Sequence, residues 1–167
     1  MSLRTFRRRP ARGFTLIEMT IALAMLVTLA TLALPMMNDV LARARVRAAG
    51  EVLVSEMAET RFAAAQRDRT MHVAFATGAD WCWAVATTPG CDCRVPQTCR
   101  GKTMGAPQFK GVELQAAQEV QFEPGGRGSG HAELKSSRGH VLRAEVGPSG
   151  RPRLCAPGAL VPGVPGC

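Results

Sequence analysis

Gly13-Phe14-Thr15-Leu16-Ile17-Glu18 is the stretch around which the rest of the chain is organised. The residues before it are strongly basic and include Arg4, Arg7, Arg8, Arg9 and Arg12. The residues after it, from Met19 to Met37, are apolar and uncharged, so Glu18 is the only charge between Arg12 and Asp39. An ionisable group in an apolar segment of membrane length is energetically costly and by default marks a functional position.

The segment from Phe14 to Met37 is long enough to cross a bilayer as a helix. Its 24 residues span roughly 36 Å, against about 30 Å of hydrocarbon core. The basic residues before it predict a cytoplasmic leader and an exported remainder. An ordinary secretory signal peptide, cut after Thr31-Leu32-Ala33, is the alternative. Against it, the apolar run exceeds the usual core of about 7–15 residues, and Glu18 stands at its start.

Charge points to an exported domain behind the anchor, and no enzyme is predicted, because none of His72, His131 and His140 stands near a Ser, Cys or Asp in a nucleophile–base pattern. The formal net charge of +8 falls to +3 for a chain that begins at Phe14, because five of the 21 Lys and Arg precede it and all 13 acids follow it. The absence of Tyr and the 5% aromatic content argue against a platform for base stacking. We expect no cofactor.

Hydrophobic periodicity predicts one helix over residues 14–67. Val46, Ala49, Leu53 and Met57 recur at steps of three and four, which gives an apolar stripe. The charged residues fall mostly elsewhere and predict a solvated face, with pairing between subunits as the alternative. They are Arg43, Arg45, Arg47, Glu51, Glu56, Glu59 and Arg61.

After Arg69 the period changes to two, which predicts β-strands. We expect a hairpin of Met71–Phe75 and Trp81–Val85 around residues 78–80. Further short strands are expected at 112–114, 120–122, 132–135 and 140–146, with loops at 87–109 and 125–130. The predicted fold class is α+β, with a long N-terminal helix packed on an antiparallel sheet. The predicted organisation is a leader (1–13), a transmembrane helix (14–37), its amphipathic continuation (38–69), a β-rich exported domain (70–155) and an irregular tail (156–167).

A basic leader ending in Gly13, followed by Phe14 and by Glu18 four residues later, resembles the type IV prepilin signal. The resemblance implies that a prepilin peptidase cuts between Gly13 and Phe14 and that Phe14 is then N-methylated. It also implies that Glu18 pairs with the terminal amine of a neighbouring subunit in a filament, which is sound because a buried carboxylate needs a partner. Pro35 matches a family proline that accompanies a kink or a melted stretch in filaments. Its simpler interpretation is a break at the membrane exit.

The second half of the chain resembles the GspH/FimT family of secretion pseudopilins and minor pilins. Phe122-Glu123-Pro124-Gly125-Gly126 and Gly150-Arg151-Pro152-Arg153 match its F-x-P-x-G and G-R-x-R patterns, whereas residues 81–109 match poorly. The resemblance implies a structural minor subunit of a type II secretion pseudopilus or a type IV pilus. Its implied partners are other pilins, the prepilin peptidase and secreted proteins. Its implied location is the bacterial inner membrane, with the C-terminal domain in the periplasm or extracted into a filament.

Arg151 and Arg153 are candidate DNA contacts. In minor pilins of the FimT type, the G-R-x-R motif is associated with DNA binding during uptake. Side chains two apart on a strand point the same way, which would give a small cationic pair. A basic run of Arg94, Arg100, Lys102 and Lys110 adds to the charge. Binding through phosphates would be salt-sensitive and independent of sequence. The alternative is a solvated strand end, and Pro152 removes one amide donor.

The six cysteines predict disulfides in an exported domain. They are Cys82, Cys91, Cys93, Cys99, Cys155 and Cys167. Their spacing is not the paired C-x2-C of a zinc ribbon, so no metal site is predicted, although a membrane-anchored metal or redox protein remains an alternative. Fifteen pairings exist, and the sequence cannot select one. We favour Cys155–Cys167, with the other four pairing among themselves.

Overall fold

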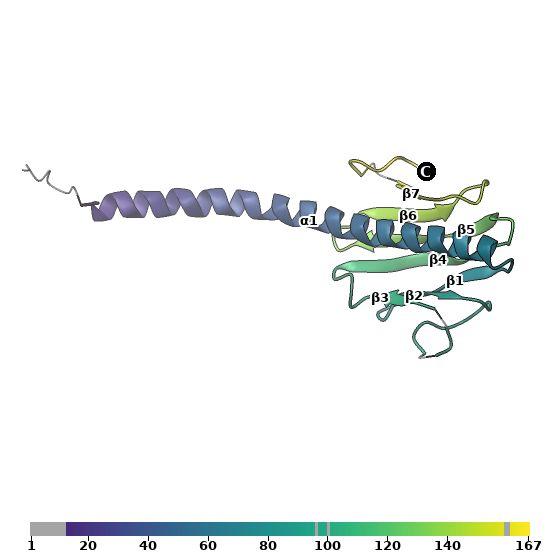
Figure 1. The fold of residues 1–167 in the computed structure, drawn as a ribbon. Helices are drawn as coiled ribbons and strands as arrows, with labels where there is room; N and C mark the ends of the chain where they lie inside the picture. Colours follow the sequence, from purple (N-terminus) through teal and green to yellow (C-terminus); the bar gives the residue numbers. More distant parts are fainter. Residues whose placement is uncertain (1–12, 96, 100, 159–160) are drawn as a thin grey trace, which may run out of the picture. The chain divides into compact units, whose positions relative to one another are not determined.

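The structure is a computed structural model that describes residues 13–95, 97–99, 101–158 and 161–167 (Figure 1). One helix, α1 (Leu16–Gln66), precedes seven strands. These are β1 (Met71–Ala76), β2 (Cys82–Ala86), β3 (Thr103–Gly105), β4 (Val112–Phe122), β5 (Gly128–Ser136), β6 (Val141–Val146) and β7 (Pro152–Cys155). The strands form one sheet in the order β3-β2-β1-β4-β5-β6-β7, and all neighbours are antiparallel. The predicted α+β class is therefore confirmed.

The chain separates into two compact units, residues 1–38 and 39–167, which are described one at a time. The first contains the apolar part of α1. Apart from Gly13, the predicted basic leader lies outside the described residues. The second contains the rest of α1 and the whole sheet.

The second half of α1 packs its apolar stripe against the sheet. Val46, Ala49, Leu53 and Met57 are all fully buried in the core, as the periodicity predicts. A buried side chain of this kind stabilises the fold by about 1.5–3 kcal/mol. Gly50 is a poor helix former within α1, but it leaves room for β7. A Cβ at this position would lie 2.6 Å from Leu154 Cδ1 of β7.

One residue of the expected solvated face of α1 is instead buried. Glu56 is only 5% exposed, and its carboxylate accepts a hydrogen bond from the ammonium of Lys102. The expectation is wrong here because the segment before β3 crosses close to the helix and brings a cation from 46 residues away. Burial of the carboxylate is tolerated because it is paired.

The inner face of the sheet carries the large side chains of the core. Phe122, Leu134 and Leu142 are fully buried there. Trp81, Trp83 and Phe109 stack on one another, with ring centroids 5.4–6.1 Å apart. The Trp81 indole donates to Val112 O at 2.9 Å, so this polar group is satisfied within the core.

The outer face of β1 and β2 is buried by the cysteine-rich loop. Its alanines, Ala74, Ala76, Ala84 and Ala86, are nearly inaccessible, and residues 90–92 and 94 line a hollow with the first two of them. Small side chains on this face give the loop room to approach. This explains why the two strands carry few polar residues at alternate positions.

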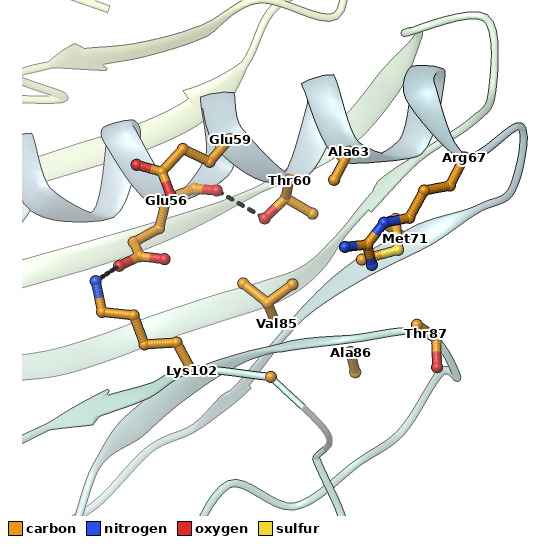
Figure 2. Close-up of a pocket in the computed structure, with 11 residues that line it drawn as sticks. Glu56, Glu59, Thr60, Ala63, Arg67, Met71, Val85, Ala86, Thr87 and Lys102 are labelled. Atoms are coloured by element: carbon orange, nitrogen blue, oxygen red, sulfur yellow. Dashed lines mark hydrogen bonds and ion pairs between the residues drawn. The ribbon is translucent and has the colours of Figure 1, made fainter.

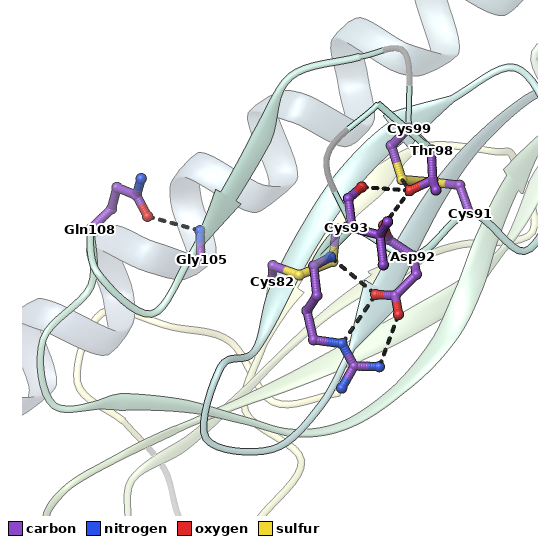
Figure 3. The surroundings of a disulfide bond; sticks show 10 residues. Cys82, Cys91, Asp92, Cys93, Thr98, Cys99, Gly105 and Gln108 are labelled. Atoms are coloured by element: carbon purple, nitrogen blue, oxygen red, sulfur yellow. Dashed lines mark hydrogen bonds and ion pairs between the residues drawn. A yellow bond between two sulfur atoms is a disulfide. The ribbon is translucent and has the colours of Figure 1, made fainter.

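All six cysteines form disulfides, which confirms that prediction. Cys82 on β2 bonds to Cys93, and Cys91 bonds to Cys99 (Figure 3). Within this ring the Thr98 hydroxyl donates to the carbonyls of Asp92 and Val95 at 2.5 and 2.7 Å. The third bond is the favoured Cys155–Cys167.

The largest differences from the predicted strands lie in β3, β4 and β5. Residues 112–114 and 120–122 belong to the single strand β4, whose register shifts between 114 and 116 and between 118 and 121. Such bulges interrupt the alternation from which two strands were inferred. The loop predicted at 125–130 is shorter because β5 begins at Gly128, and the loop predicted at 87–109 contains β3.

The tail after Cys155 has no helix or long strand in its described part, yet it belongs to the core. Val161 and Val164 are buried against the core cluster. Ala156, directly after β7, donates its N–H to Pro165 O at 2.8 Å and accepts from Cys167 N at 3.1 Å. The end of the tail therefore pairs with the chain next to the edge strand β7.

Candidate functional site

Thr15 is the N-cap of α1. Thr15 Oγ1 accepts the N–H of Glu18 at 3.3 Å, and Thr15 O accepts the N–H of Met19 at 3.2 Å. A Thr hydroxyl at this position satisfies an amide group that has no partner within the helix. The Glu18 carboxylate is also favoured there by the helix dipole. Gly13 and Phe14 lie just before this turn, and Phe14 is 77% exposed.

The apolar part of α1 exposes a continuous hydrophobic surface. Its mean hydropathy reaches 2.1 over 18 residues, so by length and composition it can cross a membrane. Three hydroxyls interrupt it, and all donate to carbonyls within the helix. Thr20 donates to Ile17 O, Thr28 to Ala24 O and Met25 O, and Thr31 to Thr28 O, at 2.8–3.0 Å. No hydroxyl of this segment then needs a partner from the surroundings, which suits a lipid environment. The α1 backbone continues through Pro35.

Two hairpin turns of the β domain share the pattern x-P-x-G-R. They are residues 123–127 between β4 and β5 and residues 147–151 between β6 and β7. In each turn the first residue donates its N–H to the fifth, at 2.9 and 3.1 Å, and the glycine donates to the first at 2.8 Å. Gly126 and Gly150 have φ of 74° and 73°, a conformation that favours glycine. Figure 1 shows both turns at the same end of the sheet.

The two turns lie in direct contact. A Cβ on Gly150 would be 2.1 Å from Gly126 O and 3.0 Å from Arg127 Cα. The carbonyl of Gly126 also accepts a hydrogen bond from Arg61 Nε of α1 at 2.7 Å. The F-x-P-x-G and G-R-x-R patterns therefore meet in space, and their glycines permit this close approach.

Arg151 and Arg153 are not an equivalent cationic pair. β7 begins at Pro152, so Arg151 precedes the strand. Arg153 on β7 donates to Glu145 Oε1 from Nε at 2.9 Å and from Nη2 at 2.6 Å. Arg151 is exposed beside the contact between the turns, where Arg127 is also exposed and lies 3.3 Å from Glu123 Oε2.

Two residues of the other basic run, Arg94 and Lys102, pair with acids. Asp92 accepts hydrogen bonds from Arg94 at 3.0–3.3 Å, and these bonds lower the pKa of Asp92 and raise that of Arg94. The hydrogen bond to Glu56 likewise raises the pKa of Lys102. Arg100 lies outside the described residues.

A hollow of about 320 Å³ lies between α1 and β2 (Figure 2). The Glu56–Lys102 pair is at one end, and Arg67 and Met71 are at the other. Among its described lining residues, none pairs a nucleophile with a general base. Elsewhere, Glu145, Cys155 and Cys167 lie within 4.8 Å of one another. Both cysteines are in a disulfide, so neither offers a thiolate to a metal.

The N-terminal segment of the chain matches a known protein-family motif. The prokaryotic N-terminal methylation motif matches residues 8–34. The matched segment carries the processing signal of type IV pilin-like proteins. This match covers Gly13, Phe14 and Glu18 and points to a structural role, to association with other pilins and to processing by a prepilin peptidase. Neither a curated protein nor a solved structure matches the chain.

Two features near the candidate sites were not predicted from the sequence. Thr15 caps the first turn of α1 by accepting the N–H of Glu18, and a Thr directly before the helix was a sufficient signal for it. The turn that carries Arg127 touches the turn that carries Arg151, and the repeated x-P-x-G-R pattern could have drawn attention to both turns. By contrast, nothing in the sequence indicates the contact between Asp39 and His140, which are 101 residues apart.

Proposed function

We propose that the chain is a minor subunit of a type IV-like filament, either a type II secretion pseudopilus or a type IV pilus, of the GspH/FimT type. The observation that carries this proposal is the methylation motif over residues 8–34, which includes most of the charge-free apolar run from Met19 to Met37. In this proposal a peptidase removes residues 1–13, Phe14 is methylated, residues 14–37 anchor the chain in the inner membrane, and the β domain is periplasmic.

Glu18 is the residue that we assign to assembly. Its side chain is exposed at the first turn of α1, surrounded in sequence by apolar residues. Burial of this carboxylate among neighbouring helices requires a positive partner, and the terminal amine of a neighbouring Phe14 would supply one. The capping hydrogen bond of Thr15 uses the amide of Glu18 and leaves its carboxylate free for this pairing.

Incorporation into filaments tests this assignment. Glu18→Gln keeps the shape of the side chain and removes its charge, whereas Glu51→Gln on the exposed side of α1 is the matched control. We expect processing of both variants, but loss of Glu18→Gln from sheared filaments or from crosslinks with partner pilins. Normal incorporation of Glu18→Gln at wild-type levels would contradict the assembly role.

DNA binding is a second candidate function, favoured by the position of Arg151. It directly follows Gly150, which closely approaches Gly126 and Arg127, and it is exposed, whereas Arg153 is held by Glu145. We therefore propose that DNA phosphates would contact the two turns, with Arg151 as the main contact and Arg153 as a minor one. Few contacts of this kind give weak binding that is lost at moderate salt.

Binding of duplex DNA by the full-length protein at low and moderate salt separates the candidates. We expect Arg127→Ala/Arg151→Ala to lose salt-sensitive binding and Arg153→Ala to retain most of it. Equal loss of DNA binding in both variants would instead support Arg151 and Arg153 as an equivalent pair of DNA contacts. No binding by the wild type at low salt would exclude the DNA role and leave a secretion pseudopilin.

A further inference from the structure

The beginning of the domain part of α1 is attached to the β5–β6 turn by three polar side chains. Asp39 Oδ1 lies 2.7 Å from His140 Nε2, and Asp39 Oδ2 accepts a hydrogen bond from Arg43. Arg43 Nε lies 3.3 Å from the same His140 nitrogen. The backbone of His140 is itself fixed, since its N–H donates to Ser136 Oγ at 3.0 Å and its carbonyl accepts from Ser136 N at 2.8 Å.

A neutral His140 cannot satisfy both of its neighbours. If Nε2 carries the proton, it donates to Asp39 and cannot accept from Arg43. If Nδ1 carries the proton, Nε2 accepts from Arg43 and turns a lone pair toward the Asp39 carboxylate. In the imidazolium Nε2 always donates to Asp39, so the tautomer that turns a lone pair toward the carboxylate is no longer available, while Arg43 has no acceptor on the ring, as in the first tautomer.

The charges around His140 favour a tighter attachment in the protonated state. The carboxylate of Asp39 is closer to the ring than Arg43 Nε, at 2.7 against 3.3 Å, so attraction exceeds repulsion at these distances. Arg43 keeps its own bond to Asp39. Glu133 of β5 faces the same hollow beside His140, but it is held by Arg143 of β6 at 2.5–3.0 Å. The tail residues Pro157 and Gly158 that also line this hollow carry no side-chain charge.

We infer that Asp39, Arg43 and His140 form a pH-sensitive latch, which holds the first turn of α1 in the domain against the β5–β6 turn more tightly when His140 is protonated. Histidine is the side chain that ordinarily changes charge between about pH 5 and pH 8. Asp39 is the first residue of the sheet-containing unit. The pH therefore determines how tightly the sheet-containing unit holds its first helical turn, which begins at Asp39.

Amide hydrogen exchange of the full-length protein in lipid nanodiscs tests the latch. The rate over residues 39–47 is divided by the rate over residues 53–60, which lie in the buried part of the same helix, to remove the pH dependence of the exchange chemistry. We expect this ratio to fall about two- to fivefold from pH 8 to pH 5, the effect of a partly exposed charged pair.

Three variants decide the result. His140→Gln and Asp39→Asn, which alter opposite ends of the latch, should each abolish the change in the ratio. His131→Gln, on β5, removes a histidine that makes no side-chain hydrogen bond in the described structure and should retain it. Tryptophan fluorescence of Trp81 and Trp83 confirms that each variant is folded. A wild-type ratio independent of pH, or a dependence that survives in His140→Gln or Asp39→Asn, would overturn the inference.

Discussion

Gly150 has two structural roles, a positive φ and a close approach to Gly126. Substitution of neighbouring glycines separates the energetic cost of the two. Alanine at this position must adopt φ near 73°, which costs about 1–2 kcal/mol. Its Cβ would also lie 2.1 Å from Gly126 O, so the two hairpin turns must move apart, at a further cost of about 1–3 kcal/mol. We therefore expect Gly150→Ala to lower the free energy of unfolding by roughly 2–5 kcal/mol, a large share of the stability of a domain.

Two neighbouring glycines are matched controls. Gly126 has the same φ, but its nearest obstacle is the flexible end of Arg61 at 3.4 Å, so Gly126→Ala should lose only about 1–2 kcal/mol. Gly147 has ordinary φ, and its Cβ would meet only Arg151 O at 3.7 Å, so Gly147→Ala should change stability by less than about 1 kcal/mol.

Urea unfolding of the full-length protein in detergent, with its disulfides intact, measures all three. Trp81 and Trp83 are the two tryptophans of the chain and both are buried in the domain, so their fluorescence reports its unfolding. The expected order of destabilisation is Gly150→Ala, then Gly126→Ala, then Gly147→Ala. Equal losses for Gly150→Ala and Gly126→Ala would show that contact between the turns does not constrain the fold.

Three further perturbations test the packing of the domain. Replacing Cys155 and Cys167 by serine should lower the free energy of unfolding by roughly 3 kcal/mol in the chain-entropy model, which urea unfolding measures; an unchanged midpoint would show that the tail is held without the bond. Lys102→Met leaves the buried Glu56 carboxylate unpaired, so it should lower the melting temperature, and adding Glu56→Gln should restore part of the loss; an additive loss would refute the pairing. Hydrogen bonding by histidine lowers the pKa of Asp39 below its usual 3.8, so the carboxylate stabilises the domain above that pH and this contribution is lost as the pH falls through the folded value. Asp39→Asn should therefore be less stable than the wild type at neutral pH and converge with it in strong acid, whereas a constant difference would contradict the shift.

The long helix and the sheet could be predicted because local pattern decides them. The charge-free run from Met19 to Met37 is predicted as a helix by its length and apolar composition, and the stripe that ends at Met57 is predicted by its period. β4 was divided in two because its bulges shift the side-chain alternation that identifies a strand. β3 was missed because three residues are too few to show a period.

Candidate sites made of residues that are contiguous in sequence were predicted, whereas contacts between distant residues were not. Gly13, Phe14 and Glu18 are recognisable because processing signals are contiguous in sequence, and the methylation motif covers all three. The neutralisation of Arg153 by Glu145 depends on the register of β6 and β7. The burial of Glu56 depends on where a loop crosses α1. Contacts of this kind arise only when the chain folds, so residue spacing does not reveal them.

The mature N-terminus tests the pilin-like assignment most directly. The chain would be purified from the membranes of cells that contain a prepilin peptidase and examined by mass spectrometry of its N-terminal peptide. Our account predicts a chain that begins at Phe14 and carries a methyl group on its α-amine, and a Gly13 variant that remains unprocessed. A chain that retains the basic leader in the presence of active peptidase, or one that begins after Ala33 as a cleaved secretory signal would leave it, would contradict the account.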